Sequence, residues 1–413
     1  MAEAASSTDS VRLKPVLDWL LTEGRLERRF DRFVDQLMNR AVAAGLPIWR
    51  FYIGLQLVHP QMVATGVLWR RGQGSEEVPR LHGILESPAY IGSPMQEVRQ
   101  KAATVRYCLT DLPDTAHAVL HELQAGGGID YVAFPMRLGR ADTIPVASFA
   151  TDRASGFSDE DVADLRRLVD MMAPIAEIYI YRNIAETVTD TYLGHIVGEQ
   201  ILGGRIKRGD GREINAVLWF SDLRDFTGLN ERMAAVDLLE LLNNYLQLVG
   251  DALKTYGGEI LKFIGDGVMA YFPAEDALFL PMVTNNAIGA ARRLIDDIES
   301  ANEARATGGH DPVRCGVGLH VGPVTFGNIG TEGRLDFTVI GPAVNRAARL
   351  EGLTKELGVP ILASAEFNAV STIPLKSLGK HTLRGVPEPV EVFTLPDPLG
   401  VIPSEARDLY RSV

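Results

Sequence analysis

The chain has 413 residues, of which 46% are hydrophobic and 23% are charged, and its formal net charge is -12 at pH 7. These fractions are typical of an ordinary globular protein, and the length predicts two or three domains. The acidic balance argues against a general nucleic-acid-binding or anionic-membrane-binding surface, because neither partner would attract an acidic protein.

The N-terminus and the cysteines predict where the protein works. The first ten residues lack the basic and apolar segments of a signal peptide. No apolar run approaches the ~20 residues that a membrane-spanning helix needs. The two cysteines, Cys108 and Cys315, lie far apart in apolar stretches, which favours a reducing compartment without structural disulfides. We therefore expect a cytoplasmic protein with no membrane span.

The first 182 residues predict an α+β domain. Residues 15–44 carry apolar side chains at three- and four-residue spacing and end at Gly45, which predicts one helix. Strands are expected in "IWRFYIGLQLV", "MVATGVLWRR", "DYVAFPMRL" and "PVASFAT". This order of helices and strands over residues 1–182 resembles a GAF-type sensor domain, which implies an unidentified small-molecule ligand.

A long helix is predicted to begin at Ser158, with Asp161 as its capping-box partner, and to run past Pro174 to about Gly203. Its apolar residues alternate three and four apart, which is typical of a helix–helix seam: Val162, Leu165, Val169, Met172, Ala176 and Tyr179. The alternative is that this face packs against its own domain. Residues 183–212 are expected to form a helical linker, and residues 397–413 a tail without structure.

Residues 213–396 alternate between strands and helices and predict a second domain. Strands are expected in "INAVLWF", "EILKFI", "VMAYF", "LDFTVIG", "PILAS", "HTLRGV" and "VEVFTL", and a pair of strands in "VRCGVGLHVGPVTFGNIG". Helices are expected in "AAVDLLELLNNYLQLVGDALKTYG", in the alanine- and arginine-rich stretch that ends near Arg305, and in "PAVNRAARLEGLTKEL".

Two carboxylates of this domain stand where buried strands end. Asp222 follows the apolar run "INAVLWF", and Asp266 lies between two strands in Gly265-Asp266-Gly267. Asp222 could be a helix N-cap, and Asp266 could simply belong to a tight hairpin turn. Taken together, two such carboxylates are what a hard cation shared with substrate phosphates requires.

Three further polar residues call for an explanation. Strand alternation predicts that Lys262 points the same way as Ile260 and Ile264, so its ammonium needs either an acceptor or a position on an edge strand. Asn345 and Arg349 lie four residues apart, hence on one face of an alanine-rich helix. They are either solvated or placed to orient a ribose and neutralise a phosphate.

Four segments in sequence, "FSDLRDFT", "ILKFIGDGVMAYF", "GVGLHVGPVTFGNIG" and "FTVIGPAVNRAARLE", resemble the catalytic domain of class III nucleotidyl cyclases. The similarity spans about residues 213–395, and "TDTYLGHIVGEQILGGRIKRGD" resembles the element that precedes many bacterial cyclase domains. The resemblance implies a ferredoxin-like βαββαβ fold and conversion of ATP to 3′,5′-cyclic AMP and pyrophosphate. It also implies two Mg²⁺ or Mn²⁺ ions per active site, at the interface of a homodimer.

The same resemblance implies roles for individual residues. Asp222, Asp266 and the carbonyl of Leu223 would bind metal, and Lys262 and Thr338 would recognise adenine. Asn345 would hold the ribose and orient the transition state. Arg349 and Arg384 would bind the phosphates as cations. Phe226 and Thr227, at the end of the first motif, would also contact the substrate. The aspartates would come from one protomer, and Lys262, Thr338, Asn345 and Arg349 from the other.

Two positions depart from the pattern of many members. Thr338 stands where many animal enzymes carry aspartate, and it matches a bacterial lysine/threonine subgroup, some members of which respond to bicarbonate. A bicarbonate site in the catalytic domain is thus implied as an option. Arg384 stands where the family usually has lysine.

Other interpretations stay open. A guanylate cyclase would typically carry glutamate at the Lys262 position. A catalytically silent nucleotide-binding or dimerisation module would have lost a metal aspartate, Asn345 or Arg349. A diguanylate cyclase or polymerase palm would show a GG-[DE]-[DE]-F signature, which this chain lacks. In the first domain, His117 and His121 are spaced to share a helix face and bind metal or haem, or are structural. Cys108 either senses redox state or packs.

Overall fold

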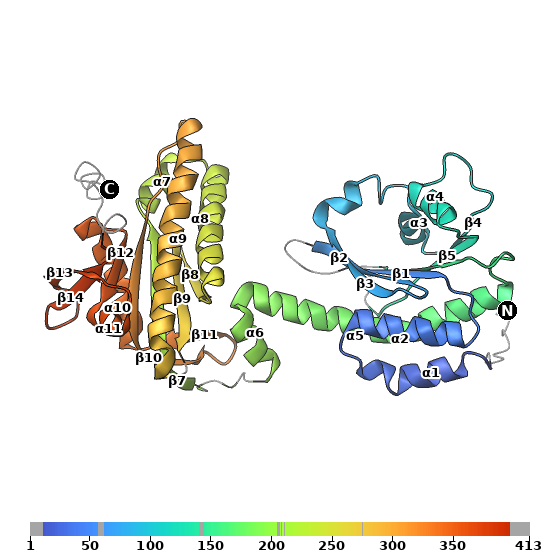
Figure 1. The fold of residues 1–413 in the computed structure, drawn as a ribbon, viewed down its shortest axis with the longest axis horizontal. Helices are drawn as coiled ribbons and strands as arrows, with labels where there is room; N and C mark the ends of the chain where they lie inside the picture. The colour runs from blue at the N-terminus through green and yellow to red at the C-terminus, as the bar shows by residue number, and fades with distance from the viewer. Residues whose placement is uncertain are drawn as a thin grey trace. The chain divides into compact units, whose positions relative to one another are not determined.

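The computed structural model describes residues 11–56, 62–139, 144–204, 207, 209, 211–274 and 276–396. The chain divides into two compact units, residues 1–191 and 192–413. Figure 1 shows both units, each a sheet with packed helices. The predicted tail, residues 397–413, lies outside the described residues. Within the described ranges, no helix combines the length and the apolar character needed to cross a membrane.

Unit 1 begins with two helices rather than the single predicted one. Helix α1 (Lys14–Leu21), the 3-10 turn η1 (Gly24–Leu26) and α2 (Phe30–Ala43) occupy the predicted helical stretch. The ring of Trp19 lies against Gly24, where a Cβ would come within 2.9 Å of it, and stacks on Phe33 at 5.9 Å between centroids. The prediction of one helix is wrong because this long-range aromatic packing folds α1 back onto α2, which periodicity along the chain cannot reveal.

The sheet of unit 1 has six antiparallel strands in the order β3-β2-β1-β6-β5-β4. The four predicted strands are confirmed as β1 (Arg50–Gln56), β2 (Met62–Arg70), β5 (Asp130–Pro135) and β6 (Val146–Thr151). The prediction missed β3 (Gly74–Leu81), η2 (His82–Glu86), α3 (Pro94–Lys101), β4 (Val105–Cys108) and α4 (Ala118–Ala125). These elements are short, with at most eight residues each, so they carry little periodic signal.

Helices cover both faces of this sheet (Figure 1). Helices α1, α2 and α5 (Asp159–Leu193) bury one face, and α3 and α4 bury the other. The predicted capping box at the start of α5 is confirmed, because the Ser158 and Asp161 side chains each accept a hydrogen bond from the other residue's backbone N–H, at 3.1 and 2.9 Å.

Helix α5 runs past Pro174 as predicted but ends at Leu193, and a separate helix α6 (His195–Leu202) follows. Gly194 between them has φ +84°, a conformation that favours glycine and interrupts the helix. The residues of the predicted seam, from Leu165 to Tyr179, are buried in the core of unit 1, and Val162 packs against it. For these residues the helix–helix seam is therefore wrong, and packing against the domain itself is confirmed.

Unit 2 contains an eight-stranded sheet in the order β13-β14-β12-β10-β7-β9-β8, with β11 paired to β10. Its first half comprises β7 (Gly211–Leu223), α7 (Phe226–Arg232), α8 (Ala235–Thr255), β8 (Glu259–Ile264), β9 (Gly267–Ala274), η3 (Ala277–Phe279), α9 (Leu280–Thr307) and β10 (Cys315–Gly330). With α8 and α9 as its helices, this half follows the predicted βαββαβ order, and its strands lie in the sheet order β10-β7-β9-β8.

The second half of unit 2 comprises β11 (Leu335–Ile340), α10 (Pro342–Leu357), β12 (Ile361–Ser364), α11 (Ala365–Val370), β13 (Lys376–His381) and β14 (Val390–Thr394). Helices α8 and α9 lie side by side on one face of the sheet (Figure 1), whereas α6, β11 and α10 cover part of the other. Gly318 of β10 allows the closest approach, because a Cβ there would overlap the backbone of α10 at Ala347 and Glu351.

Strand β10 corrects a second prediction. The stretch predicted to be two strands is one strand, which pairs with β7 without interruption from Cys315↔Leu223 to Gly327↔Gly211. Gly322-Pro323 has the composition of a turn. The long ladder to β7 overrides that local preference and keeps Pro323 in the strand, opposite Asn215.

Candidate active site

Asp222 and Asp266 are brought together at one end of the sheet. Asp222 is the second-to-last residue of β7, and it pairs with Gly316 of β10. Asp266 lies in the two-residue turn between β8 and β9, where Gly265 has φ +66°. The pKa of Asp222 is raised to about 8, mainly by burial and secondly by the adjacent Asp266 carboxyl. Two carboxyl groups in such proximity resist simultaneous ionisation.

The simpler explanation of Asp222 as an N-cap is wrong. The next helix, α7, begins at Phe226, and its N-cap position is held by Asp225 with φ +58° and no side-chain capping bond. The hairpin-turn interpretation of Asp266 is confirmed, but it does not explain why the carboxyl faces Asp222.

The two carboxyl groups fit a hard cation. Oδ1 of Asp222 and Oδ2 of Asp266 are buried and have no hydrogen-bond partner in the described parts of the chain. Gly267 lines the same space, since a Cβ there would stand 3.4 Å from Asp222 Oδ1. The described residues contain no group of three or more His, Cys, Asp or Glu side chains that could hold a metal. A cation here would therefore use two carboxylates and, as Mg²⁺ typically does, complete its shell with water and substrate phosphate.

The strand end that carries Asp222 is held from both faces of the sheet. On one face, the Tyr245 hydroxyl of α8 donates a hydrogen bond to the Ser221 hydroxyl at 3.2 Å. On the other, Arg224 pairs with Glu351 of α10 at 3.1 Å and also donates to Thr354. These contacts of Arg224 were not predicted from the sequence, although Arg224 lies inside the first motif.

Removing one member of the Arg224–Glu351 pair should be costly, because the two side chains are only 12% and 13% exposed. We expect Arg224→Met to lower the free energy of unfolding by about 3–5 kcal/mol, since it leaves a buried carboxylate without its partner. Replacing both residues, as Arg224→Met with Glu351→Leu, should recover much of that loss in urea denaturation. If the double variant is as unstable as the sum of the single ones, the pair contributes no coupling energy.

Lys262 lies on the edge strand β8, and it contacts an acceptor that was not predicted. A register shift between Ile260 and Lys262 places Ile260 opposite Ala270 and Lys262 opposite Met269. Neighbouring residues of β9 point to opposite faces, so Lys262 does not share the side of Ile260. The predicted alternation is wrong at this point because of the β-bulge, and it holds for Ile264, which lies opposite Gly267.

The acceptor is Asp336 of β11, which forms an ion pair with the Lys262 ammonium. Thr338, the predicted partner of Lys262, lies two residues further along β11 and is 7% exposed. Alternation puts Asp336 and Thr338 on the same side of their strand. The fold thus brings Lys262 to the strand that carries Thr338, across a gap of more than seventy residues.

Two predicted phosphate-binding arginines lie at a common corner. Arg349 is half-buried on α10, and its guanidinium lies beside Gly385, where a Cβ would stand 3.2 Å from it. Arg384 is exposed in the turn between β13 and β14, next to Gly385. Asn345, one helical turn before Arg349, is exposed. No hydrogen bond or ion pair within the described residues joins Asp222 or Asp266 to any of these three.

The remaining predicted positions are placed as follows. Leu223 is the last residue of β7, and Phe226 and Thr227 form the start of α7. Phe226 packs partly against the core below α8, and Thr227 is exposed.

The candidates of unit 1 have structural explanations. His117 caps α4, with Nδ1 accepting from the Val119 N–H at 3.2 Å and Nε2 lying 3.0 Å from the Pro88 carbonyl oxygen. The helix begins at Ala118, so the shared helix face with His121 is wrong. Cys108 is exposed at the end of β4, against the prediction of an apolar environment, because β4 is an edge strand, whereas Cys315 is buried.

Most of unit 2 is similar to a known protein family. Residues 212–396 match the family of adenylate and guanylate cyclase catalytic domains. The terminal-differentiation-specific adenylate cyclase of Dictyostelium discoideum is 30% identical over 264 residues, which are 62% of this chain and 12% of that protein. An adenylate cyclase of Anabaena cylindrica is 39% identical over 147 residues, which are 35% of this chain and 28% of that protein. The chain therefore spans less than a third of the length of either relative.

A solved structure agrees at the level of the fold. A bacterial light-regulated adenylyl cyclase is similar with a TM-score of 0.50 and 22% identity, covering 66% of this chain and 89% of that one. The family match, the four ordered motifs and the βαββαβ arrangement coincide in one stretch of the chain. Over residues 212–396 the chain therefore resembles the catalytic domain of the adenylate and guanylate cyclase family.

Proposed function

We propose that the chain is an adenylate cyclase that converts ATP to 3′,5′-cyclic AMP and pyrophosphate. The observation that carries the proposal is the facing pair Asp222 and Asp266, each with a buried carboxyl oxygen that has no donor in the described structure. The relatives named above, both adenylate cyclases, support the same activity.

In the proposed site, Asp222, Asp266 and the Leu223 carbonyl hold two divalent cations, Mg²⁺ or Mn²⁺. When bound, these cations supply Lewis acidity, which stabilises negative charge on the phosphates and lowers the pKa of the ribose 3′-hydroxyl. Arg349 and Arg384 neutralise phosphate oxygens, and Asn345 holds the ribose so that its 3′-oxygen lies in line with the α-phosphorus. Phe226 and Thr227 border the phosphates at the start of α7.

Base recognition is assigned to Lys262 and Thr338. A lysine ammonium carries three N–H donors, so Lys262 can keep its contact with Asp336 and still donate to a ring nitrogen of adenine. The hydroxyl of Thr338 can accept from the adenine amino group. The proposed specificity therefore belongs to Lys262, Asp336 and Thr338 acting together.

The assay of the full chain with ATP and with GTP, in the presence of Mn²⁺, tests the proposal. We expect ATP to be the preferred substrate. We expect Lys262→Ala to lower kcat/KM for ATP. The loss of transition-state stabilisation should be about 1–3 kcal/mol, which is the value of a hydrogen bond from a charged donor. Lys254→Ala, an exposed lysine at the end of α8, is the matched control and should behave like the native chain.

Two results would contradict this assignment. Equal efficiency with GTP would favour the guanylate cyclase alternative. Absence of product from both nucleotides, with ATP still bound, would favour a silent nucleotide-binding module.

We further propose that the enzyme is a homodimer whose active sites combine the aspartates of one protomer with Lys262, Thr338, Asn345 and Arg349 of the other. The second half of α5 offers a surface for association. Five of its side chains, at three- and four-residue spacing, form an apolar stripe: Ile178, Tyr181, Ala185, Val188 and Tyr192. Ala185 is half-buried, and the other four are exposed. Such spacing is typical of a two-helix seam.

Residues 1–182 are proposed to be the regulatory part and residues 183–212 the connection to the catalytic domain. The mixed α+β fold of unit 1 and its own buried core support a domain with a separate task.

A further inference from the structure

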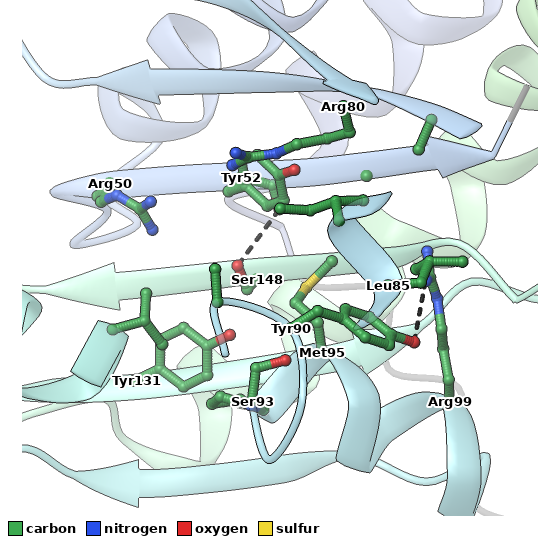
Figure 2. Close-up of a pocket in the computed structure, with 16 residues that line it drawn as sticks. Arg50, Tyr52, Arg80, Leu85, Tyr90, Ser93, Met95, Arg99, Tyr131 and Ser148 are labelled. Carbon is green, nitrogen blue, oxygen red and sulfur yellow. Dashed lines mark hydrogen bonds between the residues drawn. The ribbon is translucent and has the colours of Figure 1, made fainter. Parts of the chain in front are cut away.

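Unit 1 contains a cavity of about 150 Å³ on the face of its sheet that α3 and α4 cover. Figure 2 shows that β1 and β6 form its floor and that the segment from β3 through η2 to α3 forms its walls. None of the proposed catalytic residues takes part. The cavity is therefore a separate feature of the chain, and what it binds does not depend on the cyclase assignment.

Among the residues that the structure describes, three arginines line this cavity, and no aspartate or glutamate does. Arg50 is half-buried in β1, with its guanidinium 6.0 Å from the centre of the Tyr52 ring. Arg80, at the end of β3, is also half-buried. Arg99 of α3 donates to the Tyr90 hydroxyl at 3.2 Å and to the Ile144 carbonyl oxygen at 3.1 Å. In the described parts of the chain, no carboxylate forms an ion pair with any of the three arginines.

This arrangement is unlike that of Arg12 and Arg106 in the same unit. Arg12 pairs with Asp161 and Asp164, at 3.0 and 2.6 Å, and Arg106 pairs with Asp130 at 2.7 Å. The chain as a whole is strongly acidic, so carboxylates are not scarce. Three arginines in one cavity whose described lining holds no carboxylate therefore create a local positive field.

Burial around Arg50 is unfavourable for its charge. Desolvation is the largest influence and lowers the pKa of Arg50; Arg70 acts in the same direction, whereas Tyr131, Tyr52 and the Glu122 carboxylate act against it without reversing the shift. A partly buried guanidinium without a counter-ion costs free energy, which an anion in the cavity would offset. The planar guanidinium is suited to carboxylate and phosphate, which it can bind through two parallel hydrogen bonds.

The rest of the wall is aromatic and apolar. Tyr52, Tyr90, Tyr131, Met95 and Leu85 line the cavity together with the hydroxyls of Ser93 and Ser148. Gly66 of β2 makes room for the Tyr52 ring, because a Cβ there would overlap the tyrosine. Cavities of about this volume admit a single six-membered ring.

We propose that this cavity binds a small organic anion, whose carboxylate or phosphate contacts Arg50 and Arg80 and whose ring packs against Tyr52, Tyr90 and Met95. Such a compound is the chemical class of signal that unit 1 would report. Carboxylate and phosphate are the two forms that the anionic group can take, and the probes below separate them.

Calorimetric titration of the full chain tests the proposal with benzoate, phenyl phosphate and the neutral analogue benzamide. We expect at least one of the two anions to bind with a Kd of about 1 mM or tighter, and benzamide to bind at least about tenfold more weakly. Stronger binding of benzoate would identify a carboxylate site, and stronger binding of phenyl phosphate a phosphate site.

Arg50→Gln should weaken anion binding by about tenfold or more, because it removes a charged donor while retaining most of the side chain. Arg25→Gln is the matched control, since Arg25 is exposed on the surface of the same unit and lies outside the cavity. If Arg50→Gln fails to fold, Arg80→Gln decides, because Arg80 is at the cavity rim on a sheet-edge strand. The proposal is overturned if neither anion binds at about 10 mM, if benzamide binds equally well, or if the folded variants bind like the native chain.

Discussion

Asp222→Asn and Asp266→Asn are each expected to abolish cyclic AMP formation at saturating Mg²⁺ or Mn²⁺. Each substitution keeps the shape of the side chain and removes one of the two carboxylates proposed to hold the cations. Loss of either should cost several orders of magnitude in kcat, because charge on the phosphates would no longer be stabilised. A variant with more than about 10% of native turnover would contradict the two-metal site.

Asp222→Asn should at the same time stabilise the metal-free protein near pH 8. The folded state raises the pKa of Asp222 to about 8, so between its ordinary value and pH 8 the folded state holds more protons than the unfolded state. Stability therefore falls as pH rises through this range, and asparagine removes the effect. We expect a gain of about 1–2 kcal/mol at pH 8, below the ~5 kcal/mol that four pKa units would imply, because solvent screens the pair.

The matched control for both measurements is Asp225→Asn. Asp225 lies in the same motif, but its side chain pairs with Arg232 and its backbone has φ +58°, which asparagine tolerates. This variant should retain turnover and show no gain in stability at pH 8. Thermal unfolding in EDTA at pH 6 and pH 8 separates the three variants. If the stability of Asp222→Asn has the same pH dependence as that of the native chain, the carboxyl pair is not the cause.

Mixing two inactive variants should restore activity if the active site is shared between protomers. Asp222→Ala and Asn345→Ala each damage both sites of their own homodimer. In a mixed dimer, one active site carries both defects and the other carries none. Random exchange of equal amounts makes half of the dimers mixed, each with one intact site, so about a quarter of native activity should return.

The control mixture is Asp222→Ala with Asp266→Ala, two variants that lie in the same half of the proposed site. In these mixed dimers every active site carries one defective aspartate, so activity should stay absent. Co-purification through two different affinity tags shows whether mixed dimers have formed. If they form and the first mixture stays inactive, each site is built within one chain and the shared-site proposal is wrong.

Local sequence patterns were enough to predict the elements that depend on neighbouring residues. Apolar periodicity was sufficient for β1, β5, β6, α8 and α10, because amphipathic helices and buried strands repeat within a few residues. The capping box of Ser158 and Asp161 spans only four residues and was equally predictable. Four ordered motifs identified the catalytic domain and placed its two aspartates at strand ends.

Which side chains meet across long separations depends on packing between distant segments, which local patterns do not contain. The bulge in β8 turned Lys262 away from the side predicted by alternation, and Asp336 became its partner. The ladder to β7 kept β10 in one piece through Pro323, and packing on the unit 1 core buried the apolar face of α5. The arginine-lined cavity is formed largely by short elements that periodicity does not predict. In each case the deciding free energy comes from contacts between segments distant in sequence, and a pattern read along the chain reports only neighbours within a few residues.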